Sequence, residues 1–505
     1  MTTKFRSVFW AFPRRLASDT RGATLALVAA SITALIGFTG LGVETGLWYA
    51  IKRQDQSAAD VAALSGAFEL LAGQSNGLSQ NTVYPDICNL AERDAARNNF
   101  AFTSFSCPTT TPACTSPPTG QMCANNPPVL GISAGNNNAV EVILSQQQNA
   151  LLANLFLPKV TIETRAVAAI KTLDTSCVLA LNNSLPDAIN VVGSAGVCLG
   201  PGSSCQACGT PTCSMTADST DPSAIHLQGA ACVAADTLIT PGGVGFTGNG
   251  HTLTVNSGPL IGAPPVADPY ASTLTHTFLT TGMPTAPACT LTGSTYNGNC
   301  VITGGLNVNK TTINLSANTQ ISGASNGGVA LDIKNGTVNL APGTYWLTDG
   351  DLDLENGSGA TLECTACTPG GAGVTIILTT ANAKNGKVGT LTLGSNANLN
   401  LSAPGSGTFA GLVLIQDSNN LPPGTTYTST TSNAQANATE SLNGLVYFPN
   451  TAMTFQGTPA AGSATCLVLV VNTLALQGNP QLNDSGCTNA GLTNLPTPKT
   501  VALTE

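Results

Sequence analysis

LDIKNGTVNL at residues 331–340 and LDLENGSGATL at residues 352–362 are two copies of one unit, offset by 21 residues. In each copy two apolar residues enclose a polar one, and Asn or Gly follows. Alternation at period two predicts a short β-strand with one buried face, so the first and third residues of each unit should point inward. Asn and Gly directly after the strand suit a turn with positive φ.

The same unit recurs elsewhere in the second half of the chain. Its further copies begin at Ile189, Ile225, Leu391, Met453 and Leu474. Many short strands at spacings near twenty residues indicate a solenoid whose coils stack on one another. We therefore expect a right-handed parallel β-helix-like domain over residues 173–505, with a β-sandwich of short strands as the alternative. Residues 262–287 are Pro-rich and are predicted to be a linker or a long loop across the stack.

A second decisive stretch is ATLALVAASITALIGFTGLGV, residues 23–43, which contains no charged residue. As a helix it is about 30 Å long, one hydrocarbon thickness. The competing interpretations are a buried core helix and a cleaved signal peptide. The run is longer than a signal peptide requires and ends in Trp48-Tyr49, the residue types of a membrane interface, so we expect an uncleaved transmembrane helix over residues 22–51.

The flanking charges give the direction of this helix. Five cations precede it within residues 1–21, and only Lys52 and Arg53 closely follow it. The positive-inside rule therefore predicts a cytoplasmic basic tail over residues 1–21 and the rest of the chain outside the cytoplasm. Glu44 lies at the outer end of the apolar run, where we expect either a surface residue or a polar contact to a partner helix.

Residues 21–72 resemble the N-terminus of TadG-like Flp pilus assembly proteins. The likeness consists of Arg21-Gly22, the small-residue-rich span, GVETG at 42–46 and QSAADVAAL at 56–64. VEVIL at 140–144 and VTIETRAVA at 160–168 extend it weakly to residue 172. The resemblance implies a pilin-like α+β head over residues 52–172, a single pass through the inner membrane with a periplasmic or extracellular bulk, and partners among pilus or secretion assembly proteins.

The chain departs from this family in two respects. Prepilin peptidase substrates carry Glu five residues beyond the cleavage Gly, whereas Leu27 stands there in this chain. Some relatives carry a metal-binding Asp-x-Ser-x-Ser loop, which the sequence lacks.

Composition narrows the class of protein further. Charged residues make up 9% of the chain, and no Arg follows Arg165. So few cations neutralise few phosphates, which argues against nucleic-acid binding. The sixteen cysteines all follow the apolar run, and an even number on one side of a membrane suggests disulfides. The disulfide candidates are Cys88, Cys107, Cys114, Cys123, Cys177, Cys198, Cys205, Cys208, Cys213, Cys232, Cys289, Cys300, Cys364, Cys367, Cys466 and Cys487.

Three patterns in the sequence contain residue types that bind ligands or act in catalysis. Asp349, Asp351, Asp353 and Glu355 form an acidic row on a predicted strand, which favours a solvated face over a calcium site. The two C-x-x-C motifs, beginning at Cys205 and Cys364, favour disulfides over a zinc site because they are far apart. The three histidines follow no ligand spacing.

We therefore predict no cofactor, no resident metal and no catalytic residue. The sequence favours a non-catalytic structural or assembly component of a Tad-type pilus or a related export and adhesion system, held by inner membrane lipid. The alternative is a surface β-helix adhesin or a polysaccharide-acting enzyme, with a surface polysaccharide as partner. An enzyme of that kind needs paired carboxylates or a cationic base beside a metal, and residues 173–505 contain no Arg.

Overall fold

The chain folds into two compact units, Met1–Lys171 with Val501–Glu505, and Thr172–Thr500. The structure is a computed structural model. It describes residues 20–505 except 104, 109–112, 152, 156, 203–204, 324–327, 355–358, 395, 436–440, 458–465, 480, 483 and 485. The sequence-based division assigned residues 173–505 to one domain. The strand at the end of the sequence instead belongs to the first unit, so the second unit is inserted into the first.

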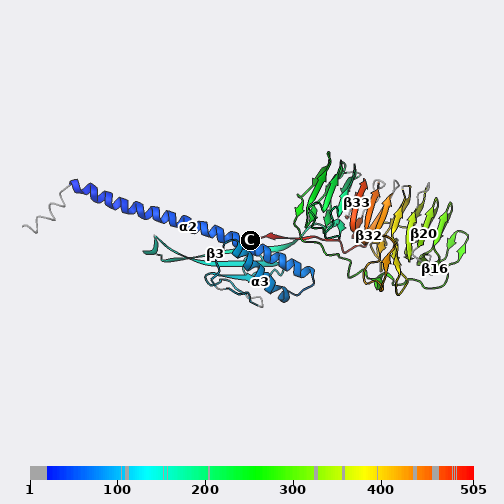
Figure 1. The fold of residues 1–505 in the computed structure, drawn as a ribbon, viewed down its shortest axis with the longest axis horizontal. Coiled ribbons are helices and arrows are strands. Elements are labelled where there is room, and N and C mark those ends of the chain that lie inside the picture. The colour runs from blue at the N-terminus through cyan, green and yellow to red at the C-terminus, as the bar shows by residue number, and fades with distance from the viewer. Residues whose placement is uncertain are drawn as a thin grey trace, which may run out of the picture. The chain divides into compact units, whose positions relative to one another are not determined.

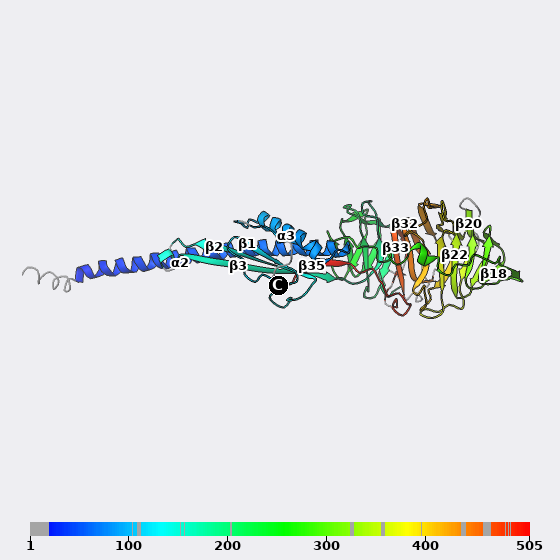
Figure 2. The ribbon, with the colours of Figure 1, turned by 90° about the horizontal axis from the view of Figure 1, so that it is seen from below.

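The first unit is built on one long helix, α2 (Thr20–Ser75), which continues past the expected end of the membrane segment at residue 51. Helix α3 (Gln80–Arg97) packs against its C-terminal half. A four-stranded sheet lies beside them in the order β1-β2-β3-β35 (Figure 2). Its strands are β1 (Gln121–Asn125), β2 (Ala139–Asn149), β3 (Lys159–Thr172) and β35 (Lys499–Leu503). The short helix η1 (Ala153–Leu155) lies between β2 and β3, which pair as an antiparallel hairpin.

Small residues let α2 approach its neighbours closely. One face of its second half is buried and consists of Ala58, Ala59, Ala62, Ala63 and Ala67. Gly66 lies on the same part of the helix, and a Cβ added there would come within 3.1 Å of the Val140 side chain on β2. The Ala-rich stretch therefore forms a flat helix face, against which the sheet and α3 bury their Val, Ile and Leu side chains.

The second unit consists of parallel strands arranged in three ladders, so that each coil of the chain pairs with the coils on either side of it. The first ladder runs β16 (Cys300–Thr303), β19 (Thr319–Ser322), β22 (Gly343–Thr348), β25 (Val374–Thr379), β29 (Leu412–Gln416), β32 (Ser441–Gly457), β33 (Leu467–Gly478), β4 (Ser176–Ala180), β7 (Ser214–Ala217), β10 (Leu238–Thr240) and β13 (Leu260–Ile261).

The second ladder also passes through the long strands β32 and β33. It runs β17 (Leu306–Asn309), β20 (Gly328–Lys334), β23 (Gly350–Leu354), β27 (Leu391–Leu393), β31 (Thr431–Gln435), β32, β33, β5 (Ile189–Val191), β8 (Ile225–Gln228) and β11 (Val244–Thr247).

The third ladder has two parts. One comprises β15 (Thr295–Tyr296), β18 (Thr312–Leu315), β21 (Thr337–Leu340), β24 (Thr361–Glu363), β28 (Asn398–Ser402) and β32, with β14 (Leu291–Thr292) antiparallel at its end. The other comprises β34 (Gln481–Leu482), β6 (Gly196–Leu199), β9 (Cys232–Ala235) and β12 (Thr252–Val255). β26 (Lys387–Val388) and β30 (Thr426–Tyr427) pair separately.

The repeat units quoted from the sequence all lie in the second ladder and stack in register. Leu331 pairs with Leu352, and Leu474 pairs with Ile189. The first and third residues of the unit at 352, Leu352 and Leu354, are fully buried, which confirms their expected inward orientation. The expected positive φ after the unit is found at Asn335, Gly193, Gly229 and Gly478.

The order of coils in space differs from their order along the chain. The chain coils from β4 to β13, then crosses through residues 262–287 to β16 at the opposite end of the ladder, and coils back until β33 lies beside β4. In Figure 1, β16, β20, β32 and β33 follow one another along this stack.

The crossing segment, residues 262–287, is a strap that runs along the outside of the first ladder. It is therefore a long loop across the stack rather than a linker, the other form that the sequence allows. It includes the short helix α4 (His276–Leu279). The amide of Val266 donates to Asp218 at 2.7 Å, and the indole of Trp346 donates to the Leu279 carbonyl at 2.8 Å. Tyr270, Leu274 and Leu279 of the strap are buried against outward-facing apolar residues of the strands. The first ladder therefore has apolar residues on both faces.

Candidate functional site

The N-terminal part of α2 exposes apolar side chains around the helix. Among the described helices it is the one long and apolar enough to cross a membrane, from Leu27 onward. The exposed large residues in it are Leu25, Leu27, Val28, Ile32, Leu35, Ile36, Phe38, Leu41, Val43 and Leu47. A helix that is apolar all round and is not covered by its own chain is suited to lipid. The expected cytoplasmic tail lies almost wholly outside the described residues.

Glu44, at the outer end of this segment, is buried by its own chain. Its carboxylate accepts a hydrogen bond from the amide of Ala153 at 2.6 Å and another from the amide of Leu151. Both donors lie in the connection between β2 and β3. The expected surface role does not fit, because Glu44 is 3% exposed and its carboxylate bonds to a hairpin of the same chain.

Arg165 on β3 is the hub of a polar network in the first unit. Its guanidinium lies 2.5 Å from the Glu141 carboxylate on β2, which is fully buried, and 2.6 Å from the Glu505 carboxylate. It also donates to the Leu130 carbonyl at 2.5 Å. The hydrogen bond from Arg165 lowers the pKa of Glu505 below its usual range. The network joins the hairpin to the end of the sequence.

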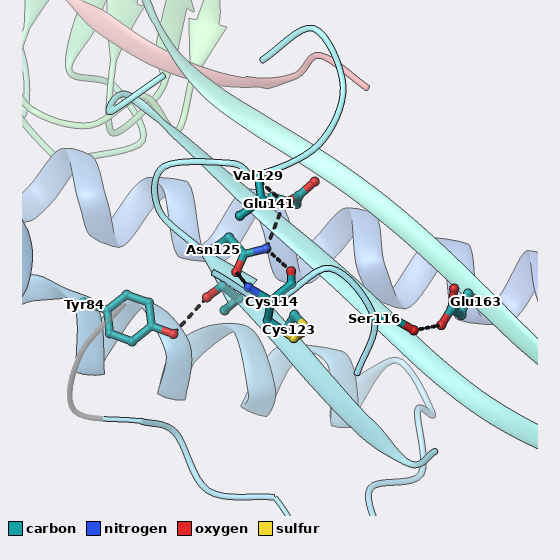
Figure 3. Close-up of a disulfide and its surroundings, with 9 residues drawn as sticks. Tyr84, Cys114, Ser116, Cys123, Asn125, Val129, Glu141 and Glu163 are labelled. Atoms are coloured by element: carbon teal, nitrogen blue, oxygen red, sulfur yellow. Dashed lines mark hydrogen bonds between the residues drawn. A yellow bond between two sulfur atoms is a disulfide. The ribbon is translucent and has the colours of Figure 1, made fainter. Parts of the chain in front are cut away.

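The second Glu141 oxygen accepts two further hydrogen bonds, which Figure 3 draws. Asn125 donates to it at 2.8 Å, and the amide of Val129 donates at 2.9 Å. Asn125 also bonds the backbone of Cys114 in both directions, beside the Cys114–Cys123 disulfide. Both oxygens of this buried carboxylate are thus bonded by the protein, which suits a structural role rather than one toward substrate.

A shallow hollow next to this disulfide is lined by Tyr84, Phe105, Pro117, Pro118 and Met122, among others. The Tyr84 hydroxyl donates to the Ala124 carbonyl at 2.8 Å (Figure 3). Burial raises the pKa of Tyr84 to about 12, so this hydroxyl stays protonated at neutral pH. The described lining of the hollow is mostly apolar, and none of its side chains can act as a general acid or base near neutral pH.

The acidic row of the second unit is occupied by hydrogen bonds between coils. Asp349 accepts from the Thr380 hydroxyl at 2.6 Å and from the amide of Lys387 at 3.1 Å. Asp351 accepts from the amide of Thr390 at 2.7 Å and from the Thr428 hydroxyl. Asp353 is half-buried on the same strand, and Glu355 lies outside the described residues. Asp349 and Asp351 thus bond neighbouring coils, although both are half-exposed on the face that the sequence predicts to be solvated.

All sixteen cysteines lie in the described part of the chain and form eight disulfides. The C-x-x-C at Cys364 closes on itself, whereas Cys205 bonds Cys232 and Cys208 bonds Cys198. The cysteines of both motifs are therefore in disulfides and offer no thiolate to a zinc ion. One described cluster has three potential metal ligands, Cys177, Cys213 and Asp484, but its cysteines bond each other. The other pairs are Cys88–Cys107, Cys114–Cys123, Cys289–Cys300 and Cys466–Cys487.

Two histidines of the second unit pair with aspartates. His276 lies 2.6 Å from Asp417, which is buried and also accepts from Thr379 at 2.6 Å. His226 lies 2.7 Å from Asp187. The His276–Asp417 pair connects α4 to the chain just after β29, and Thr379 connects the same carboxylate to β25. These contacts attach the strap to the strands.

Comparison with known proteins identifies one part of the chain. No curated protein and no solved structure matches the chain. Residues 22–69 match the Tad family model, described as Flp pilus-assembly TadE/G-like. This range includes the exposed apolar segment of α2, Glu44 and the buried Ala face.

Proposed function

We propose that this protein is a membrane-anchored, non-catalytic structural or assembly component of a Tad-type (Flp) pilus or a related export and adhesion system. One observation carries the proposal. The family match over residues 22–69 coincides with the helix that exposes an apolar segment at one end and packs into a folded unit at the other. A helix of this kind joins a bilayer to an assembly surface.

In this proposal α2 crosses the inner membrane once, uncleaved, with its N-terminus in the cytoplasm. The cations before the span exceed those that closely follow it. Eight disulfides support an oxidising compartment for everything beyond the span, which is the periplasm or the cell exterior.

The fold classes belong to the proposal as well. The first unit is a pilin-like α+β head, since a long helix packs its second half across an antiparallel sheet. The second unit is a right-handed parallel β-helix. Three parallel ladders and fully buried strand residues such as Ile225 and Leu476 support this assignment over a sandwich.

A pull-down of the tagged full chain from detergent-solubilised membranes tests the function. We expect pilus secretion components to be recovered. Two variants, compared at matched expression, assign the recruiting unit: Leu70→Asp places a charge in the core of the first unit, and Leu352→Asp places one in the core of the second.

The outcomes of that experiment separate the alternatives. Loss of the secretion components with Leu70→Asp alone supports assembly through the first unit. Loss with Leu352→Asp alone assigns recruitment to the second unit. Recovery of surface polysaccharide without any secretion component would overturn the assembly proposal in favour of an adhesin.

A further inference from the structure

The connection between β2 and β3 is unusually apolar for an exposed loop. The sequence of this connection, ALLANLFLP at 150–158, contains Asn154 as its one polar side chain and no charge. We define the hairpin tip as its described residues, 150–151, 153–155 and 157–158. Leu151 is 76% exposed and Leu157 is 46% exposed. Leucines exposed together at the end of a hairpin mark a surface that is covered by something in the working protein.

The hairpin tip lies beside the apolar segment of α2. Figure 2 shows β2 and β3 running along α2 toward its N-terminal end, away from α3. Ala153 of the tip lines one apolar hollow together with residues of the span, namely Ala34, Ile36, Gly37, Phe38, Gly40 and Leu41. Gly37 is seven residues before Glu44, which is about 10 Å along a helix. The tip therefore reaches past the outer end of the span to the level of its outer half.

The backbone of the tip is bonded in a way that suits a medium without water. Ala150 donates to the Pro158 carbonyl at 3.0 Å, and Leu157 donates to the Ala153 carbonyl at 2.8 Å. The amides of Leu151 and Ala153 both donate to Glu44. Non-helical backbone is tolerated at membrane depth where the protein itself satisfies its polar groups. Glu44 provides this for the amides of Leu151 and Ala153, and these bonds also compensate a carboxylate placed near hydrocarbon.

The residues that flank the tip suit a lipid headgroup layer. Lys159 follows the tip directly, is exposed, and pairs in register with Asn149 across the hairpin. On α2, Tyr49 is 64% exposed and is followed by Lys52 and Arg53. Aromatic and cationic residues that flank exposed leucines are the residue types found at a bilayer surface.

We propose that the hairpin tip inserts into the outer leaflet of the bilayer that α2 crosses, and so provides a second membrane contact. This inference rests on the proposed anchoring by α2. Its ligand is lipid, met by Leu151 and Leu157, with Lys159 at the phosphate level. Two contact points, one helix and one hairpin, restrain the tilt of the first unit relative to the membrane plane more than a single helix does.

Depth-dependent quenching in nanodiscs tests the inference with the full chain. Because all native cysteines are bonded, an introduced cysteine supplies the reactive thiol for a fluorophore. Three sites are labelled separately: Leu157→Cys in the tip, Ile36→Cys in the span, and Ile132→Cys, which is 91% exposed in the connection between β1 and β2. Nitroxide lipids carry the quencher either near the headgroup or near the chain end.

We expect strong quenching at 157 by the shallow nitroxide, quenching at 36 by the deep nitroxide, and little at 132. In a Glu44→Ala background the signal at 157 should weaken while that at 36 persists. If 36 is quenched and 157 is not, the insertion is wrong and the anchor stands. If neither is quenched, the proposed anchoring itself fails. Quenching at 157 that appears only in an assembled pilus complex would assign the tip to a protein partner and overturn the lipid assignment.

Discussion

In the strands of the second unit, the tolerance of a residue to substitution depends on whether its side chain points into the core or toward the surface. Along β23 the apolar residues Leu352 and Leu354 are fully buried, while the intervening Asp353 is half-buried at the surface. The same alternation holds for Leu306 and Val308 on β17, between which Asn307 is exposed. Because each strand is short, one inward residue makes up a large share of the core of its coil.

Leu352→Asp is expected to destabilise the second unit by several kcal/mol, about 3–5, because it buries a charge without a partner. Asn309→Asp is the matched control. It lies at an exposed position of the same ladder, opposite Lys334 in register, and should change stability by less than about 0.5 kcal/mol. Urea unfolding of both variants measures this. Equal midpoints would show that the inward assignment is wrong.

Arg165→Gln should destabilise the first unit by about 3–5 kcal/mol, since it leaves the buried Glu141 without its cation. Arg97→Gln is the control, because Arg97 is an exposed residue paired with Asp94 on the helix surface, where such pairs contribute about 0.5 kcal/mol or less. Hydrogen exchange at the Val167 amide, which bonds to the Glu505 carbonyl, reports the effect locally. Unchanged protection there would contradict the role of Arg165 as the hub.

At the scale of elements, the strap is the part of the second unit that does not follow from the repeat. It is fastened through buried polar groups as well as apolar contacts. Asp268 accepts from the Tyr447 hydroxyl at 2.6 Å, and Asp218 accepts from the Val266 amide. Burial raises the pKa of both carboxyl groups. The strap attachment therefore responds to pH.

Desolvation raises the pKa of Asp218 to about 7, with a further increase from Asp268. In the unfolded chain an aspartate titrates near about 4. Between these values the folded state retains a proton that the unfolded state has lost, so stability should fall as pH rises from about 4 to about 7. Asp218→Asn, which keeps the acceptor for Val266, should flatten this dependence. Urea midpoints across that range measure it, and an identical slope in the variant would exclude Asp218 as the cause.

At the scale of the whole molecule, the disulfides cross-link both units within themselves. Cys88–Cys107 joins α3 to the chain after it, and Cys466–Cys487 joins the residue before β33 to the segment between β34 and β35. Closing such loops restrains the unfolded chain by about 2–4 kcal/mol per bond.

Thiol labelling of the denatured, unreduced protein should therefore detect almost no free cysteine. Reduction should lower the unfolding temperature of both units, because each contains its own disulfides. The comparison uses the same sample before and after reduction. A majority of labelled thiols before reduction would refute the assignment to an oxidising compartment.

The proposed topology also belongs to this scale. A reporter fused after residue 60 should be active only outside the cytoplasm, and the mature N-terminus should precede Gly22. The same reporter fused before residue 21 serves as the control with the opposite expectation. Cytoplasmic activity after residue 60, or an N-terminus beyond Gly22, would contradict the uncleaved N-in anchor.

Several features were predictable from the sequence because they depend on local pattern alone. The uncharged run at residues 23–43 predicts a lipid-length helix, and alternation at period two predicts the buried positions of each strand. The Gly or Asn after a unit predicts its positive φ. Each of these properties is fixed within a few residues of chain, so neighbours far away in sequence do not alter it.

Only the tertiary structure decided which strands are neighbours. Apolar-x-apolar strands are nearly equivalent partners in a ladder, so the repeat does not show that β33 pairs with β4 or that a strap carries the chain to the far end of the stack. Likewise, Arg165 and Glu505 are separated by 340 residues, and Glu44 and Ala153 by 109. Such contacts leave no local signature, because a single charge in the sequence does not indicate which distant group will satisfy it.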